Sequence, residues 1–192
     1  MGIDTAAGLA EVLDRAMAAG QAGGFELKDM AKWLPPQMAL ARRLGLNGQS
    51  GITELLVANQ ASMITAGSRD QAGNNLVNLL GKINSHDTAQ DFSKLGIDLT
   101  GTLAAANAKG MNSLDAFVAL MDRVMSKDPR FKKARAAAER ATGSDRQAAL
   151  DAQVDLFAGS AIGKVMQDRE SLLGLIGQMN RSVGPKQARA IG

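Results

Sequence analysis

Apolar positions recur with the period of an α-helix along most of this chain. Such a spacing places the apolar side chains on one face of a helix, and that face has to be covered by a neighbour. No segment alternates apolar and polar residues as a strand would. The sequence therefore predicts an all-α protein whose many short helices pack as hairpins or a bundle. The clearest stripes are Leu9, Val12, Leu13, Ala16 and Met17; Ile52, Leu55, Leu56 and Met63; Leu76, Leu79, Leu80 and Ile83; and Leu114, Phe117, Val118 and Met121.

Residues typical of helix ends lie between these stripes. Asn112 is a favourable N-cap, and Asp128 followed by Pro129 combines a cap with proline at the first helical position. Pro35 and Pro36 are expected to kink or split a helix that runs from about Glu26 to Leu44. Capping boxes are predicted at Ser68 with Gln71, Asp87 with Gln90 and Ser144 with Gln147, and left-handed glycines after helices at positions 20, 45, 67, 96, 110 and 143.

The character of the chain changes after Met125. Residues 1–125 are predicted to form a helical core domain. Residues 126–192 are richer in Ala, Arg, Lys, Asp and Gln, which predicts a basic and then amphipathic extension of longer helices. We expect this extension to project from the core or to pair between chains, and its C-terminus from Ser182 to Gly192 to be frayed.

Composition limits the classes of protein that remain. The chain has 192 residues, of which 45% are hydrophobic, so it is long enough and apolar enough to bury a core. It has no cysteine, which excludes disulfides and thiolate metal sites. The first twenty residues lack the pattern of a signal peptide, and no apolar run approaches the roughly 18 residues that cross a bilayer. We therefore expect no membrane role for this segment.

The residue types that carry catalysis are scarce. His86 is the only histidine, and we interpret it as a solvated residue at the start of a helix. A zinc site would need several ligands at close spacing, and paired catalytic carboxylates would need an acidic residue in a distinctive apolar setting. None of the five glutamates stands out in this way. We expect no catalytic residue, no cofactor and no metal, although a cell-wall-degrading enzyme is kept as a third hypothesis.

Positive charge is concentrated in residues 123–146. This segment holds eight Lys or Arg against three Asp or Glu, whereas residues 1–122 hold nine against twelve. One interpretation is a solvated helix with pairs such as Arg135 with Glu139. The alternative is an interaction module that binds nucleic acid or an acidic partner, without the aromatic residues that stack on bases. The candidate contacts with an anionic partner are Arg123, Lys127, Arg130, Lys132, Lys133, Arg135 and Arg140.

One long run of the chain resembles a known family in the order and spacing of its helices and glycines. The residues that carry the likeness include Phe25–Ala31, Leu34–Pro35, Leu44–Gly48, Leu55–Ala58, Ala66–Ser68, Asn74–Leu76, Leu79–Leu80 and Asp91–Leu99. This run is similar to the core region of the tail tape measure proteins of long-tailed bacteriophages and prophages. The likeness covers about residues 6–125, and its motifs are individually unspecific.

The resemblance implies a structural role. Proteins of this family are long and mostly helical, lie stretched inside the tail tube, and set its length while tube subunits assemble around them. It implies tail tube and baseplate proteins and tail assembly chaperones as partners, self-association, and a place in the virion tail after assembly in the host cytoplasm. Fully helical, this chain would span only about 290 Å. It is therefore expected to be a fragment of such a protein or a truncated prophage remnant.

Overall fold

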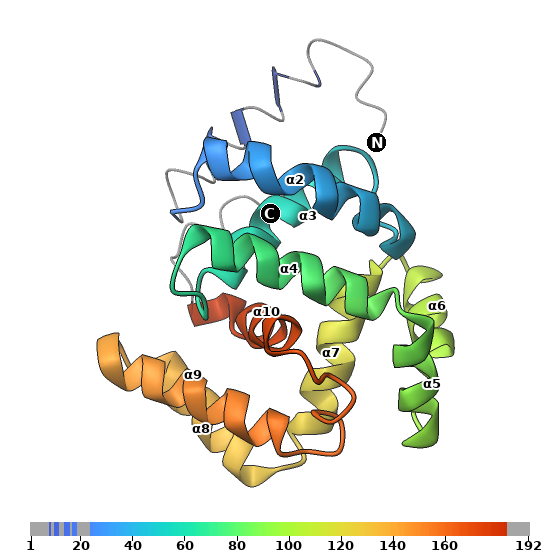
Figure 1. Ribbon diagram of the computed structural model, residues 1–192, viewed down its shortest axis with the longest axis vertical. Coiled ribbons are helices and arrows are strands. Elements are labelled where there is room, and N and C mark those ends of the chain that lie inside the picture. Colours follow the sequence, from blue (N-terminus) through green and yellow to red (C-terminus); the bar gives the residue numbers. More distant parts are fainter. Residues whose placement is uncertain (1–7, 9, 12–13, 16, 19–23, 184–192) are drawn as a thin grey trace.

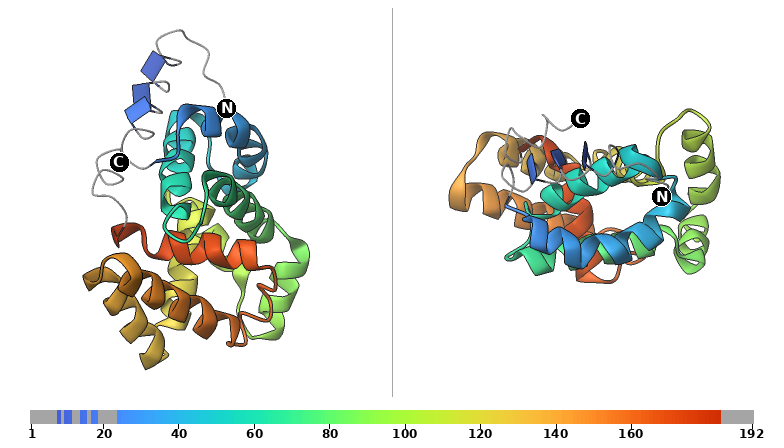
Figure 2. Two further views of the ribbon diagram at one scale, coloured as in Figure 1. Left: turned by 60° about the vertical axis from the view of Figure 1, so that its left-hand side comes forward. Right: turned by 90° about the horizontal axis from the view of Figure 1, so that it is seen from above.

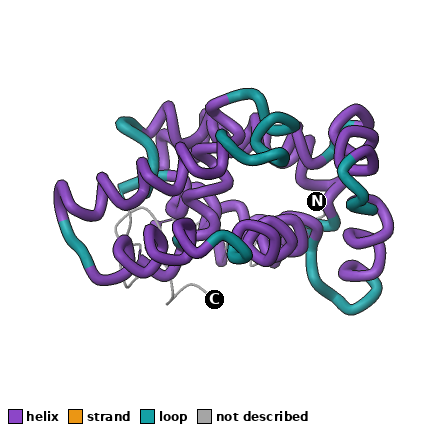
Figure 3. Tube along the Cα trace, turned by 90° about the horizontal axis from the view of Figure 1, so that it is seen from below, coloured by secondary structure: helices purple, strands orange, loops and turns teal. Residues whose placement is uncertain are grey.

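The fold is all-α, as the sequence predicts. The computed structural model describes residues 8, 10–11, 14–15, 17–18 and 24–183, and the regular structure in residues 24–183 consists of α-helices and two 3₁₀ turns (Figure 3). The expected first stripe, its terminal Gly20 and the frayed end beyond residue 183 lie largely outside the described residues. In chain order the elements are α2 (Leu27–Ala41), η1 (Arg42–Leu44), α3 (Gly48–Ser62), α4 (Arg69–Ile83), α5 (His86–Lys94), α6 (Leu99–Asn107), α7 (Ser113–Met125), α8 (Pro129–Arg140), α9 (Gly143–Ala158), α10 (Arg169–Met179) and η2 (Arg181–Val183).

Several predicted helix starts are confirmed by their cap hydrogen bonds. The Asn112 side chain accepts from the backbone N–H of Asp115 at 2.9 Å, which begins α7. Asp128 caps α8, and Pro129 occupies its first position. The Ser68 hydroxyl accepts from the Gln71 N–H at 3.1 Å and begins α4. These polar side chains satisfy backbone donors that have no partner inside the helix.

Two predicted starts are wrong by two residues. α5 is capped by Ser85, which leaves Asp87 in the first turn, where its negative charge suits the positive end of the helix dipole. α9 begins at Gly143 after Thr142, so Ser144 lies inside its first turn. Gly143 has the predicted left-handed conformation, with φ of 54°, but it opens α9 instead of ending α8. The glycines at 45, 96 and 110 have positive φ as expected, whereas Gly67 does not.

The proline pair does not split its helix, contrary to one form of the prediction. α2 runs continuously through Pro35 and Pro36 before it tightens into η1. Both prolines are exposed, and so are Ala31 and Lys32, whose carbonyls lie one helical turn earlier. Carbonyls on the solvent side of a helix can bind water when a proline removes their usual donor. The free-energy cost of the two prolines inside α2 is therefore smaller on this solvent-facing side of the helix than it would be in the core.

The hydrophobic core extends across the whole described chain. One cluster contains buried residues from Ala41 in α2 to Met179 in α10, and Phe92 and Phe117 meet edge to face within it, with ring centroids 6.0 Å apart. A smaller cluster around Phe25 and Met30 lies beneath the start of α2. The division of the chain at residue 125 stays a prediction, and the packing shows that residues on both sides of it share one cluster.

α10 is the central helix of the molecule, although it is the last α-helix in the described part of the chain. Figure 1 and Figure 2 show it between the layer of α2, α3 and α4 and the hairpin of α8 and α9. Every residue from Ser171 to Asn180 is buried. The expectation that the C-terminal part projects from the core is therefore wrong for α10. The expected lengthening of helices holds only for α9, with 16 residues, since α8 has 12 and α10 has 11.

Glycines let α10 approach its neighbours closely. A Cβ atom at Gly174 would lie 2.8 Å from the carbonyl oxygen of Asn75 in α4. A Cβ atom at Gly177 would lie 2.7 Å from the carbonyl oxygen of Ala61 in α3. Close approach also permits long-range hydrogen bonds, because Gln178 Nε2 donates to the Ala58 carbonyl at 2.8 Å. The joint of α3, α4 and α10 thus depends on backbone contact as well as on apolar side chains.

Candidate functional site

The basic segment predicted from sequence lies at the end of α7 and along α8. Six of its seven candidate residues are exposed, and Arg135 is half-buried. Arg135 turns inward, forms an ion pair with Asp122 of α7, and donates to the Met179 carbonyl at 3.0 Å. The predicted pair of Arg135 with Glu139 is wrong, because Asp122 is the carboxylate that Arg135 reaches across the helix packing.

The structure therefore separates the seven candidates by role. Arg130 is occupied by Asp128, whose Oδ2 lies 2.7 Å from its Nη2. This contact lowers the pKa of the Asp128 carboxyl, with the side-chain hydrogen bond from Arg130 as the largest cause. Arg135 acts inside the fold as a link between α7, α8 and α10. The exposed candidates that have no ion pair among the described residues are Arg123, Lys127, Lys132, Lys133 and Arg140.

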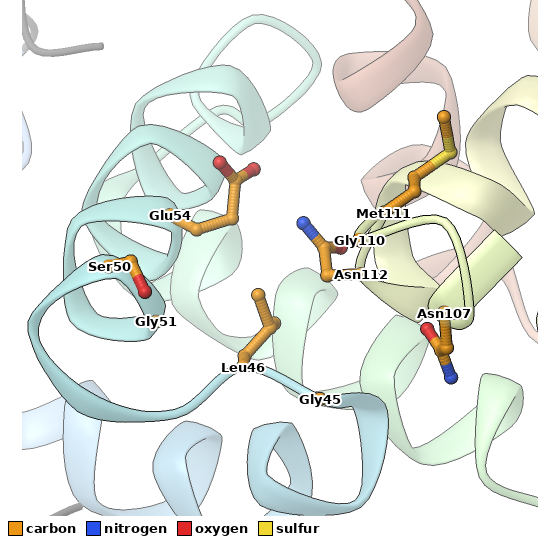
Figure 4. Close-up of a pocket in the computed structure, with 9 residues that line it drawn as sticks. All are labelled: Gly45, Leu46, Ser50, Gly51, Glu54, Asn107, Gly110, Met111 and Asn112. Atoms are coloured by element: carbon orange, nitrogen blue, oxygen red, sulfur yellow. The ribbon is translucent and has the colours of Figure 1, made fainter.

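A cavity of about 450 Å³ lies between the turn after η1, the start of α3 and the α6–α7 connection (Figure 4). Apart from Leu46 and Met111 its lining residues are glycines or polar residues, and Glu54 and Asn112 face it from opposite walls. The Ser50 hydroxyl in the lining donates to the backbone oxygen of Asn47 at 3.2 Å. A nucleophilic serine would instead need a base that accepts its proton. The lining consists of Gly45, Leu46, Ser50, Gly51, Glu54, Asn107, Gly110, Met111 and Asn112.

A charged cluster lies beside this cavity. Arg181 Nη1 is 2.7 Å from Glu54 Oε1 and 3.3 Å from Asp115 Oδ1, and Arg181 Nε donates to Gln178 Oε1 at 2.8 Å. Burial is the largest influence on Glu54 and raises the pKa of its carboxyl, against the opposing charge of Arg181. Glu54 and Asp115 converge on one guanidinium, so the cluster ties α3, α7 and η2 together.

Sequence reasoning missed this cluster. Glu54 lies on α3 directly before Leu55 and Leu56 of the apolar stripe. A charged residue next to buried apolar positions was the only signal in the sequence that could have indicated the cluster. The structure places Glu54 partly out of solvent beside Arg181 and Asp115, which is a charged setting and not an apolar one. Arg181 could not have been assigned to it, because 127 positions of chain separate the two residues and only the tertiary fold brings them together. The interpretation of His86 is confirmed, since it is exposed at the first position of α5.

The described residues offer few other sites. Among them, His, Asp and Glu side chains nowhere gather in groups of three that could hold a metal ion. None of the helices in the described part of the chain combines the length and the apolar character that a membrane span requires. A second cavity, of about 410 Å³, lies between η1, α5 and α6, and is lined mainly by apolar and amide side chains together with Arg43 and His86.

Comparison with known proteins identifies the family. The family model of phage-related minor tail proteins matches residues 1–152. A protein described as a probable tape measure protein, from Burkholderia phage BcepMu, is 31% identical over 173 residues, which are 90% of this chain and 20% of that protein. The chain thus spans about a fifth of that relative's length. No solved structure matches. The chain belongs to the phage-related minor tail proteins, a family of structural components of phage tails.

Proposed function

We propose that this chain acts as a helical segment of a tape measure protein that sets tail length and templates assembly of the tail tube. The observation that carries the proposal is the alignment of nine tenths of the chain with a protein described as a probable tape measure protein. The all-helical architecture supports it. A helix rises about 1.5 Å per residue, so the length of a helical chain converts linearly into distance.

On this proposal the chain works through packing and length, without catalysis. In the charged cluster beside the first cavity, the carboxylates of Glu54 and Asp115 are both paired with the guanidinium of Arg181. The partners would be tail tube and baseplate proteins and tail assembly chaperones. The place of action would be the virion tail, after assembly in the host cytoplasm. A clearing assay on purified peptidoglycan tests the absence of wall-degrading activity, and clearing would contradict it.

A length experiment in the parent phage tests the ruler role. Residues 129–158, which contain α8 and α9, are deleted or duplicated in frame in the full tape measure protein. If these thirty residues are helical in the tail, the tail shortens or lengthens by about 45 Å. Electron microscopy of negatively stained particles measures the change.

The matched control replaces residues 129–158 with an unrelated helical sequence of equal length. We expect unchanged tail length in this control, because on this proposal the length of the helical segment, and not its sequence, sets the length of the tail. Tails of normal length after both deletion and duplication would contradict a ruler role for this region. Altered length in the equal-length control would show that specific contacts of the hairpin, rather than its reach, determine the result.

A further inference from the structure

The outward faces of α8 and α9 carry opposite charges. Lys133 and Arg140 are seven positions apart and therefore lie on one side of α8, both exposed. Asp151 and Asp155 are four positions apart on α9 and are likewise exposed. The inward faces of the two helices are apolar, with Phe131 and other buried side chains. The hairpin thus presents a basic helix beside an acidic one, and Figure 1 shows the ribbons of the two helices lying together.

Within the part of the chain that the structure describes, these charges are not neutralised. Among the described residues, no ion pair joins α8 to α9. Lys133 and Arg140 contact no carboxylate there, and Asp155 contacts no cation. Asp151 accepts only a neutral hydrogen bond, from Gln147 Nε2 at 2.9 Å. Both rows of charge are therefore available to a partner.

The positions between the charges are small. Ala136 and Ala137 accompany the cations on α8, and Ala148 and Ala152 accompany the carboxylates on α9. Small side chains let two helices come close, toward the short end of the usual interaxial distance of about 8–10 Å. The views of Figure 2 place the hairpin at the edge of the molecule, away from α5 and α6. A second hairpin can therefore reach this face without displacing a described helix.

We propose that two copies of the chain pair through this hairpin about a twofold axis, with α8 of each copy against α9 of the other. A twofold axis makes such an interface self-complementary, so the two α8–α9 contacts form together. Lys133 and Arg140 of one copy then face Asp151 and Asp155 of the second. The second copy fits this surface better than DNA does, because a phosphate backbone along α8 would also meet the carboxylates of α9. The inference stands apart from the length-setting role.

Charge reversal tests the pairing. One variant carries K133E and R140E, so both of its helix faces are acidic, and the other carries D151K and D155K, so both are basic. Each variant alone should be monomeric, with a dissociation constant at least about tenfold above that of the wild type. An equimolar mixture should associate again, because each α8 then faces an α9 of opposite charge. Sedimentation velocity over a concentration series measures these states, and salt should weaken the wild-type dimer.

The control variant carries R43E and K109E, which reverse two exposed cations outside the hairpin. It should associate like the wild type, and circular dichroism should show unchanged helix content in all variants. A wild-type chain that stays monomeric up to about 1 mM overturns the proposal. So does unchanged association of either reversal variant, or failure of the mixture to associate. Salt-sensitive binding of duplex DNA that strengthens in D151K/D155K, with a monomeric wild type, would assign the basic face to nucleic acid instead.

Discussion

The close approach of α10 to α3 and α4 predicts an unusual response to alanine. In an exposed helix interior, replacing glycine by alanine gains up to about 1 kcal/mol. At Gly174 and Gly177, however, the added Cβ would meet backbone oxygens at 2.8 and 2.7 Å. Ordinary contacts begin near 3.4 Å, so α10 would have to move by several tenths of an ångström. Because α10 is buried on every side, that movement disturbs other contacts.

The size of the effect follows from two opposing terms. Overpacking a buried site costs about 1–3 kcal/mol, and the gain in helix propensity offsets up to about 1 kcal/mol of it at each position. With the middle of that range at each of the two positions, we expect the G174A/G177A variant to lose about 2–4 kcal/mol in total. Gly81 in α4 provides the control, because a Cβ atom there has no neighbour within 4 Å. The G81A variant should keep or gain up to about 1 kcal/mol.

Urea unfolding followed by circular dichroism measures the free energy of unfolding of all three proteins. The expected loss corresponds to a lower melting temperature, by about 2–4 °C per kcal/mol for a chain of this size. A G174A/G177A variant as stable as G81A would refute the reasoning, because it would mean that α10 can shift without cost. Two separate transitions in the wild type would contradict the single cluster that joins α10 to the earlier helices.

Three further predictions concern buried polar side chains. Q153L leaves the buried Asn180 Oδ1 without its donor, while Asn180 Nδ2 keeps the Ile176 carbonyl, and it should cost about 1–3 kcal/mol in urea unfolding. Q153L/N180L should recover part of that loss, and equal losses would contradict the reciprocal bonds at 3.3 and 2.8 Å. N75L should be neutral or stabilising by thermal unfolding, since the buried Asn75 amide meets no hydrogen-bond partner in the described chain, and a large loss would show that it has one. Burial raises the pKa of Glu54 above 4.5 in the folded state, so the stability that Glu54 contributes decreases as pH rises from about 4.5 through the folded pKa. The E54Q variant should lack this part of the pH dependence of the free energy of unfolding. Parallel curves of stability against pH for E54Q and the wild type would contradict the prediction.

The sequence was sufficient for the local features of the fold. Asn112 and the Asp128–Pro129 pair mark helix starts by chemistry that acts within three residues, and the structure confirms both. At α5 the prediction chose Asp87 because Gln90 follows three residues later, whereas the cap is Ser85, two residues earlier. The effect of Pro35 on its helix could not be predicted from the sequence, because it depends on whether the carbonyl that loses its hydrogen bond faces solvent or the core.

Long-range features were beyond the sequence. The apolar period of α10 predicted a helix, but nothing local indicated that its glycines meet α3 and α4. The basic segment was visible as composition, whereas its division into Arg135, which turns inward, and Lys133 and Arg140, which face outward, required the tertiary packing. The partner of Glu54 was hidden for the same reason.

The central position of α10 has a consequence for how the chain folds during synthesis. The hydrogen bond from Thr65 to the Leu173 carbonyl joins residues 108 positions apart. A ribosome adds about 5–20 residues per second, so the apolar faces of α3 and α4 stay uncovered for roughly 5–20 s until α10 has been synthesised. Throughout that interval the nascent chain exposes surface that the finished fold conceals. Any factor that must act on the open chain has this period in which to bind.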